Sequence, residues 1–229
     1  MNWVVENLGL IGELTLIHLR QSVIALAIGF VISIPLGWVA WRYRLVRSSV
    51  ITITGLLYTI PSLALLIILP AATGWYSFTS ETNLIVALTI YAIAILVRSV
   101  ADGLDSVDPG VRQASTAIGY GSFRRFWAVE FPLAGPVILA GLRVTAASTI
   151  SLATVGILVG ITNLGYLFTN GSQRRIIPEV LAGVVAVVLL ALVVDLILVL
   201  AGRVLLPWTR RVPTPKPRRS PAIPAGAGA

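Results

Sequence analysis

The sequence contains no cysteine, one histidine and one lysine. Without cysteine there is no disulfide and no thiolate metal site, and a single histidine does not build a zinc centre. The one lysine, Lys216, stands in a proline-rich stretch, so the chain has no GxxxxGK(S/T) phosphate-binding loop. We therefore expect no resident metal and no nucleotide site here. If ATP drives the function, a separate subunit must bind the ATP and its Mg²⁺.

Charged residues are scarce as well. They make up 11% of the 229 positions, whereas hydrophobic residues make up 57%; in soluble domains about a quarter of residues are charged. The composition predicts a multi-pass integral protein of the cell (plasma or inner) membrane. The net charge of +8 does not indicate nucleic acid, because basic residues at the ends of apolar runs are accounted for by insertion topology and anionic lipid.

Five apolar runs suit helices that cross the membrane, which need about 20 residues. They are 21–41, 48–80 with its helix ending near Leu69, 84–97 with its flanks, 131–173 with its helix ending near Gly160, and 180–202. The fold class is therefore all-α, with a transmembrane domain over 21–206. Residues 1–20 precede it as an extracytoplasmic segment, in which 3–19 are expected to form a short interfacial helix. Residues 207–229, rich in Pro and Arg, are expected to be a disordered cytoplasmic tail.

The distribution of basic residues predicts the orientation. One set of connections carries thirteen of the seventeen Lys and Arg residues: Arg42, Arg44, Arg47, Arg98, Arg112, Arg124, Arg125, Arg203, Arg210, Arg211, Lys216, Arg218 and Arg219. The opposite set carries Arg174 and Arg175. This places the N-terminus outside, and the C-terminus and the loop 101–131 in the cytoplasm. The outer loop 73–83 has no basic residue and holds Trp75, Tyr76 and Phe78, as an interfacial aromatic belt would.

The loop 101–131 is predicted to contain two short helices. Asp108 followed by Pro109 is a favourable helix start, and Gly119 and Gly121 can take the positive φ that ends a helix. A second helix begins at Ser122, and Pro132 then opens the fourth span. The bulky residues of this second helix are Phe123, Phe126 and Trp127, with Arg124 and Arg125 between them. Two readings stay open: the pair packs on its own spans or in the headgroup layer, or it is a docking knob for a cytoplasmic subunit.

The same stretch resembles the EAA loop of permease subunits in bacterial ABC importers. That pattern is Glu-Ala-Ala, a Gly after three more residues, then nine residues to Ile-x-Leu-Pro; the matching positions are Gln113, Ala114, Ser115, Gly119, Val129, Phe131 and Pro132. The departures are Gln for Glu at 113, Ser for Ala at 115 and Phe for Leu at 131. The resemblance implies a type I importer permease (MetI-like) fold, with these residues, Phe123 and Phe126 coupling the chain to an ATPase.

Further segments look like permeases of glycine betaine, carnitine and choline importers. They are Thr59 to Ala64 (TIPSLA), Tyr91 with Arg98, Val107-Asp108-Pro109, Ala140 to Arg143, and Ala153-Thr154; Ile95 and the run Gly160 to Gly165 depart from the pattern. The resemblance implies a non-enzymatic permease for osmoprotectants. Its implied partners are a second copy or a sister permease, an ABC ATPase and an extracytoplasmic substrate-binding protein.

Several polar positions within the spans are candidates for function. Thr59, Pro61, Ser62 and Tyr91 are candidates for the translocation path, with a structural bend as the other role of Pro61. Arg98, Arg143 and Asp195 are candidate structural or gating charges. Arg143 either anchors the loop or reaches to lipid phosphate, and Asp195 is expected to pair with a nearby Arg. His18 is expected to be solvated or interfacial.

Other functions fit the sequence less well. An importer for another small solute, such as an amino acid, shares the EAA pattern. A secondary transporter is expected to show repeats and midplane ionisable groups, whereas this sequence offers Asp195 and no repeat. A membrane enzyme would need a convergent set of catalytic groups, which so few polar residues within the spans do not supply.

Overall fold

The computed structural model describes residues 2–74 and 76–209, and within them every regular element is helical. Trp75 of the predicted aromatic belt and the basic residues Arg210, Arg211, Lys216, Arg218 and Arg219 lie outside the described residues. The α-helices are α1 Asn2–Glu6, α2 Leu8–Arg42, α3 Arg44–Thr59, α4 Ser62–Thr73, α5 Glu81–Asp105, α6 Pro109–Ala117, α7 Ser122–Arg125, α8 Phe131–Ala153, α9 Gly165–Gln173 and α10 Ile177–Leu205. A π-helical turn, Phe126–Glu130, joins α7 to α8, and 3-10 turns cover Thr154–Val159 and Pro207–Thr209.

Among the described residues, four helices are long and apolar enough to cross a membrane: α2, α5, the continuous helix Ser122–Val159, and α10. A fifth span results if α3 and α4, which meet at an angle of 105°, are taken together. The prediction of about five spans is confirmed in this form. The second predicted helix is two helices, because the chain breaks at Ile60 and Pro61 rather than kinking there.

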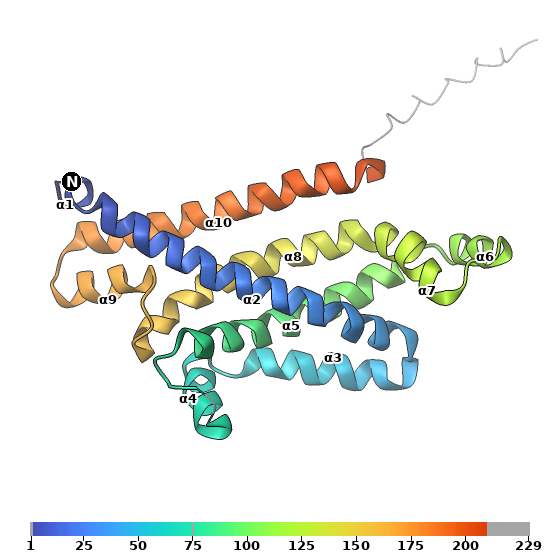
Figure 1. Cartoon of the computed structure of the whole chain (residues 1–229), viewed down its shortest axis with the longest axis horizontal. Helices are drawn as coiled ribbons and strands as arrows, with labels where there is room; N and C mark the ends of the chain where they lie inside the picture. Colours follow the sequence, from blue (N-terminus) through green and yellow to red (C-terminus); the bar gives the residue numbers. More distant parts are fainter. Residues whose placement is uncertain (1, 75, 210–229) are drawn as a thin grey trace, which may run out of the picture.

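The long helices run along the long axis of the molecule (Figure 1). One end holds the α2–α3 turn, α6, α7 and the end of α10, whereas α1 and α9 lie at the other end (Figure 1). We call the first of these the basic end, because the described basic residues predicted to be cytoplasmic lie toward it. Pro207–Thr209, which the sequence places in the tail, form a turn that continues from α10.

Helix α2 is longer than predicted. It spans 35 residues, roughly 52 Å at 1.5 Å per residue, so the predicted boundary at residue 20 falls inside a continuous helix. Arg20 does not interrupt it, because its guanidinium lies 2.7 Å from the carboxylate of Glu81 at the start of α5. The prediction for His18 is wrong: its side chain is fully buried, and its Nε2 lies 2.9 Å from the carbonyl oxygen of Ile150.

Small residues on α2 let it lie against α5, the most buried of the long helices. A Cβ atom added to Gly29 would lie 2.6 Å from the Cβ of Ala92, and one added to Gly37 would lie 2.6 Å from the Cβ of Val100 and 2.9 Å from the carbonyl oxygen of Val97. All three distances are shorter than van der Waals contact. The α2–α5 interface is therefore a close backbone approach that depends on glycine.

We predict that Gly37→Ala destabilises the protein by about 1–3 kcal/mol, because the new methyl group overpacks this interface. Gly55→Ala is the matched control, since nothing lies within 4 Å of a Cβ at Gly55 in α3; we expect a gain of up to about 1 kcal/mol from helix propensity there. Chemical unfolding of the two variants in detergent measures both effects. Equal shifts in the two variants would contradict the packing argument.

Candidate functional site

The loop at the basic end folds as two short helical pieces, α6 and α7 with the π-helical turn that follows it. We call this part of the chain, residues 108–130, the elbow. Asp108 caps α6, since its Oδ1 accepts from the Gly110 N–H at 2.6 Å, and Pro109 occupies the first helical position. The helix ends at Ala117, and Gly119 follows with a φ of 91°, so that the Tyr120 N–H donates to the Ser115 carbonyl. Both predicted signals are confirmed. Gly121, by contrast, keeps a φ of −67° and leads into α7.

The second piece differs from the prediction. Pro132 does not open a separate span, because the chain is helical without a break from Ser122 to Val159. The π-helical turn Phe126–Glu130 accommodates the proline: the N–H of Phe131 donates to the carbonyl of Phe126, one residue further back than in an α-helix. The elbow is thus a direct extension of α8.

An ion-pair cluster ties the elbow to the bundle. Glu130 is 1% exposed, with Nε of Arg125 at 2.9 Å and Nε of Arg112 at 3.8 Å from its Oε1. Arg112 also donates to the carbonyl of Leu104 at the end of α5, and its guanidinium lies 4.7 Å from the ring centroid of Trp41. This Glu130 cluster therefore links α2, α5, α6 and α7 to the π-helical turn that leads into α8, and it satisfies a carbonyl at the end of α5.

Aromatic side chains divide between the core and the surface of the elbow. Phe126 is buried and contacts Trp38, Trp127 and Phe131, with ring centroids 6.4, 4.9 and 5.7 Å away. Phe123 is 80% exposed and Ile118 75% exposed. Burial of Phe126 matches the first reading of the loop, in which it packs on its own spans. The exposed Phe123 and Ile118 fit the second, because large apolar side chains left uncovered at a loop tip are typical of an interface.

The residues that match the EAA pattern, from Gln113 to Pro132, are likewise divided between buried and exposed positions. Gln113, Ala114 and Gly119 are exposed, whereas Ser115 is buried and donates to the Arg112 carbonyl at 2.8 Å. Val129, Phe131 and Pro132 are half-buried where the elbow joins α8. The structure thus brings the predicted coupling residues together in one element, with Gln113 and Ala114 facing outward.

The break between α3 and α4 collects the candidate path residues. Thr59 is the last residue of α3, Pro61 caps α4 and Ser62 begins it. The buried Tyr91 of α5 donates its hydroxyl to the carbonyl of Ile60 at 2.6 Å. Because a broken helix leaves backbone groups unpaired, this hydrogen bond supplies the Ile60 carbonyl with a partner and joins the break to α5. The bend predicted for Pro61 is present, and it is sharper than a kink.

The candidate charges fall into two settings. Arg143 of α8 and Asp195 of α10 form a two-pronged ion pair, with N–O distances of 2.6 and 2.8 Å, so the structure supplies the expected arginine partner of Asp195. Arg98 is exposed and lies 3.5 Å from Asp102, one helical turn further along α5. The Arg143–Asp195 pair joins α8 to α10, whereas the Arg98–Asp102 contact lies within α5.

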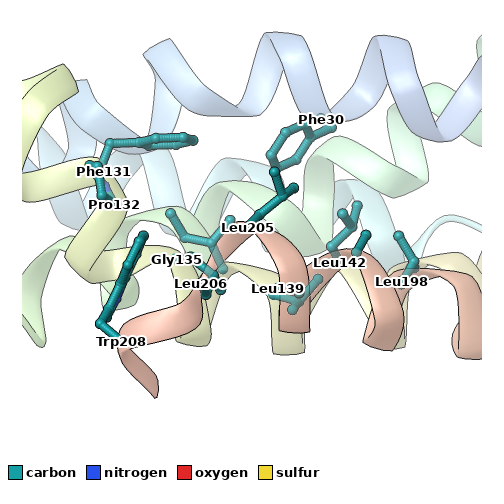
Figure 2. A pocket seen from close by; sticks show the side chains of 13 residues that line it. Phe30, Phe131, Pro132, Gly135, Leu139, Leu142, Leu198, Leu205, Leu206 and Trp208 are labelled. Atoms are coloured by element: carbon teal, nitrogen blue, oxygen red, sulfur yellow. The ribbon is translucent and has the colours of Figure 1, made fainter. Parts of the chain in front are cut away.

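An apolar cavity of about 370 Å³ lies between α8 and α10 near the basic end. Figure 2 shows its lining: Phe131, Pro132, Gly135, Leu139 and Leu142 from α8, Leu198 and Leu205 from α10, Leu206 and Trp208 beyond it, and Phe30 from α2. None of these side chains is charged, so the cavity holds no group that would compensate the charge of a ligand. Among residues 2–74 and 76–209, no group of three His, Asp or Glu side chains is placed to hold a metal ion.

Sequence reasoning missed two polar clusters. The Glu130 cluster was one, although a glutamate inside WAVEFP, between aromatic residues, was a signal that its charge needs a buried partner. The other joins α2 to the loop after α8: Asn163, fully buried, donates to the Ala153 carbonyl at 2.7 Å and to Gln21 at 3.3 Å. His18 belongs to the same region. No local pattern marks these residues, because Gln21 is 142 positions from Asn163 and Ile150 is 132 positions from His18.

Comparison with known proteins identifies the relatives of this arrangement. The sequence model of the family described as "Binding-protein-dependent transport system inner membrane component" matches residues 29–211. The osmoprotectant import permease protein OsmW of Salmonella typhimurium is 31% identical over 192 residues, which cover 83% of this chain and 89% of the relative. The choline transport system permease protein OpuBB of Bacillus subtilis is 33% identical over 185 residues, covering 79% and 82%.

The fold has a close match among solved structures. A chain of the structure described as "Inward facing conformations of the MetNI methionine ABC transporter" superposes with a TM-score of 0.77. The match covers 86% of this chain and 97% of that one at 22% sequence identity. The predicted all-α, type I importer permease fold is thereby confirmed.

We predict that Glu130→Gln destabilises the protein by about 3 kcal/mol, because it leaves two arginines in the cluster without their shared carboxylate. Trypsin cleavage at the elbow should become faster in the same variant. Asp102→Asn is the control, since Asp102 pairs with Arg47 and Arg98 at 3.5 Å and is 48% exposed; we expect a change below about 1 kcal/mol. Chemical unfolding and timed proteolysis measure both. A Glu130→Gln protein as stable as Asp102→Asn would show that the cluster does not anchor the elbow.

Proposed function

We propose that this chain, which belongs to the family of binding-protein-dependent transport system inner membrane components, is the permease subunit of an ATP-driven importer of quaternary ammonium osmoprotectants. It is a multi-pass membrane protein with the type I importer permease fold. In the proposed function it forms the translocation path together with a second copy or a sister permease, and it takes substrate from an extracytoplasmic binding protein. The chemistry of ATP hydrolysis belongs to a separate subunit.

The elbow is the observation that carries this proposal. Its base is fixed to α2, α5 and α8 through the Glu130 cluster, while Phe123 and Ile118 project from it uncovered. An element that is rigidly joined to the spans and apolar at its tip is suited to receive force from a partner. Because the sequence offers no phosphate-binding loop, we propose that the partner is an ABC ATPase, which places the basic end in the cytoplasm.

The substrate class is supported by the relatives. Their names specify osmoprotectants, choline, carnitine and glycine betaine, and the TIPSLA stretch of this chain lies at the break between α3 and α4. We propose that the break, with Thr59, Pro61, Ser62 and Tyr91, borders the translocation path. Most of the selectivity then resides in the binding protein, where aromatic rings can surround a quaternary ammonium group.

Transport follows from two states of the assembly. ATP closes the ATPase pair, the elbows move with it, and the spans exchange an inward-open for an outward-open arrangement. The permease contributes a difference in stability between the two states rather than a chemical step.

Uptake by cells that produce the whole assembly tests the proposal. The permease, its ATPase and its binding protein are co-expressed in cells without other osmoprotectant uptake, and accumulation of labelled glycine betaine, choline and carnitine is measured. Methionine and histidine serve as competitors. ATP-dependent uptake of a quaternary ammonium compound, with the ATPase copurifying on the tagged permease, is the expected result.

Two outcomes would redirect the proposal. Competition by an amino acid, with no accumulation of quaternary ammonium compounds, would keep the importer and replace its substrate. Uptake that persists with an ATPase unable to hydrolyse ATP, and that follows an ion gradient, would indicate a secondary transporter.

We predict that Gly119→Trp abolishes ATP-driven uptake while the chain still inserts into the membrane. Nothing lies within 4 Å of a Cβ at this position, so the indole would meet the partner rather than its own chain. Gly119→Asn is the control, because asparagine takes a positive φ with less strain than other side chains do and adds little bulk; it should retain most uptake. If both variants lose uptake equally, backbone strain explains the loss, and if neither does, the elbow is not the docking element.

A further inference from the structure

We propose that the elbow accepts an acidic side chain of the ATPase in a cationic pocket; the inference rests on the proposed function and specifies the chemistry of its coupling contact. The pocket has a volume of about 630 Å³ and lies between the last turn of α2 and the elbow. Three arginines line it: Arg42 from α2, Arg112 from α6 and Arg125 from α7. Figure 1 places these elements at the same end of the molecule.

The charges in this pocket do not balance. Glu130 is the carboxylate that neutralises the cluster, and both Arg112 and Arg125 pair with it. Arg42 is exposed, and within the described residues it makes no hydrogen bond or ion pair. Three guanidinium groups therefore face one carboxylate, which leaves two positive charges uncompensated. Such an excess of one sign attracts a group of opposite charge.

The excess positive charge of the pocket remains because residue 113 is a neutral glutamine. Its side chain lines the pocket, is exposed and has no hydrogen-bond partner among the described residues. A carboxylate at this position would lie among the three arginines and neutralise one of them from within the chain. The neutral amide leaves them available to a partner. The position that carries an acid in the EAA pattern therefore faces a cationic pocket here, so the partner must supply the negative charge.

The lining favours a protein carboxylate over a lipid headgroup. Beside the arginines and Gln113 the pocket has Trp41 and two small residues of α6, Thr116 and Ala117, and no aliphatic chain longer than a methyl group. A lipid would need an apolar channel for its acyl chains next to its phosphate. The apolar groove between α2 and the elbow, which Val31, Trp38 and Phe126 line, shares no residue with this pocket.

Charge variants at Arg42 and Gln113 test the pocket and leave Glu130, Arg112 and Arg125 themselves unchanged. The full-length permease, with any sister chain that purifies with it, is placed in nanodiscs and titrated with the ATPase subunit of the uptake complex. We expect Arg42→Glu and Gln113→Glu each to weaken ATPase binding about tenfold, and the Kd of the wild-type chain to rise with ionic strength. Arg44→Glu is the matched control: it is an exposed arginine of α3 outside the pocket, and its Kd should stay within about twofold of wild type.

A charge swap then locates the partner. Replacing the contacting Asp or Glu of the ATPase by Arg should weaken binding to the wild-type permease and restore binding to Arg42→Glu. Tighter binding by Gln113→Glu, or no change in either variant, would overturn the proposal while leaving the importer function intact. An effect of Arg42→Glu that disappears in nanodiscs without anionic lipid would assign the pocket to a headgroup and also overturn it. A wild-type permease that binds no ATPase would overturn both the pocket and the proposed function.

Discussion

A backbone carbonyl that loses its helical hydrogen bond inside a bilayer finds no water molecule to donate a hydrogen bond in its place. This constraint shapes the described part of the chain. Where α3 stops, the hydroxyl of Tyr91 donates to the Ile60 carbonyl. Where α8 passes into a 3-10 turn, Asn163 donates to the Ala153 carbonyl. At the basic end, in the loop that the sequence places outside the membrane, Arg112 donates to the Leu104 carbonyl in the same way where α5 ends. Each donor comes from a different element than its acceptor, so the interruptions that shape the spans also join them to one another.

The Glu130 cluster combines this role with a second one. A buried carboxylate is unfavourable unless it is paired, and here the pairing requires Arg112 from one side of the elbow and Arg125 from the other. The elbow therefore folds against the bundle even though α6 is short and exposed. The loop has one face that packs on its own spans, as the first reading predicts, and one exposed face that the second reading assigns to a partner. Phe126 lies on the first face and Phe123 on the second.

Features with local causes could be predicted from the sequence, and features with distant causes could not. Asp108 and Gly119 mark the ends of α6 through their own backbone geometry, and the spans follow from the length of apolar runs. The start of α2 was misplaced because Arg20 is compensated by Glu81, 61 residues away. Burial of His18 was missed for the same reason, since its acceptor is 132 residues distant. A single sequence shows which side chains need a partner, but not where the fold supplies one.

Under the proposed function, a displacement at the elbow has two stiff routes into the membrane. The first is the continuous helix from Ser122 to Val159, and the pair Arg143–Asp195 extends it to α10. The second is α5, which receives the elbow at Leu104 and holds the break between α3 and α4 through Tyr91, 13 residues or roughly 20 Å earlier. A helix transmits displacement along its axis, whereas the break at Ile60 and Pro61 has few peptide hydrogen bonds to oppose a change of angle. Movement that enters at the elbow is therefore expected to concentrate at the break, where the candidate path residues lie.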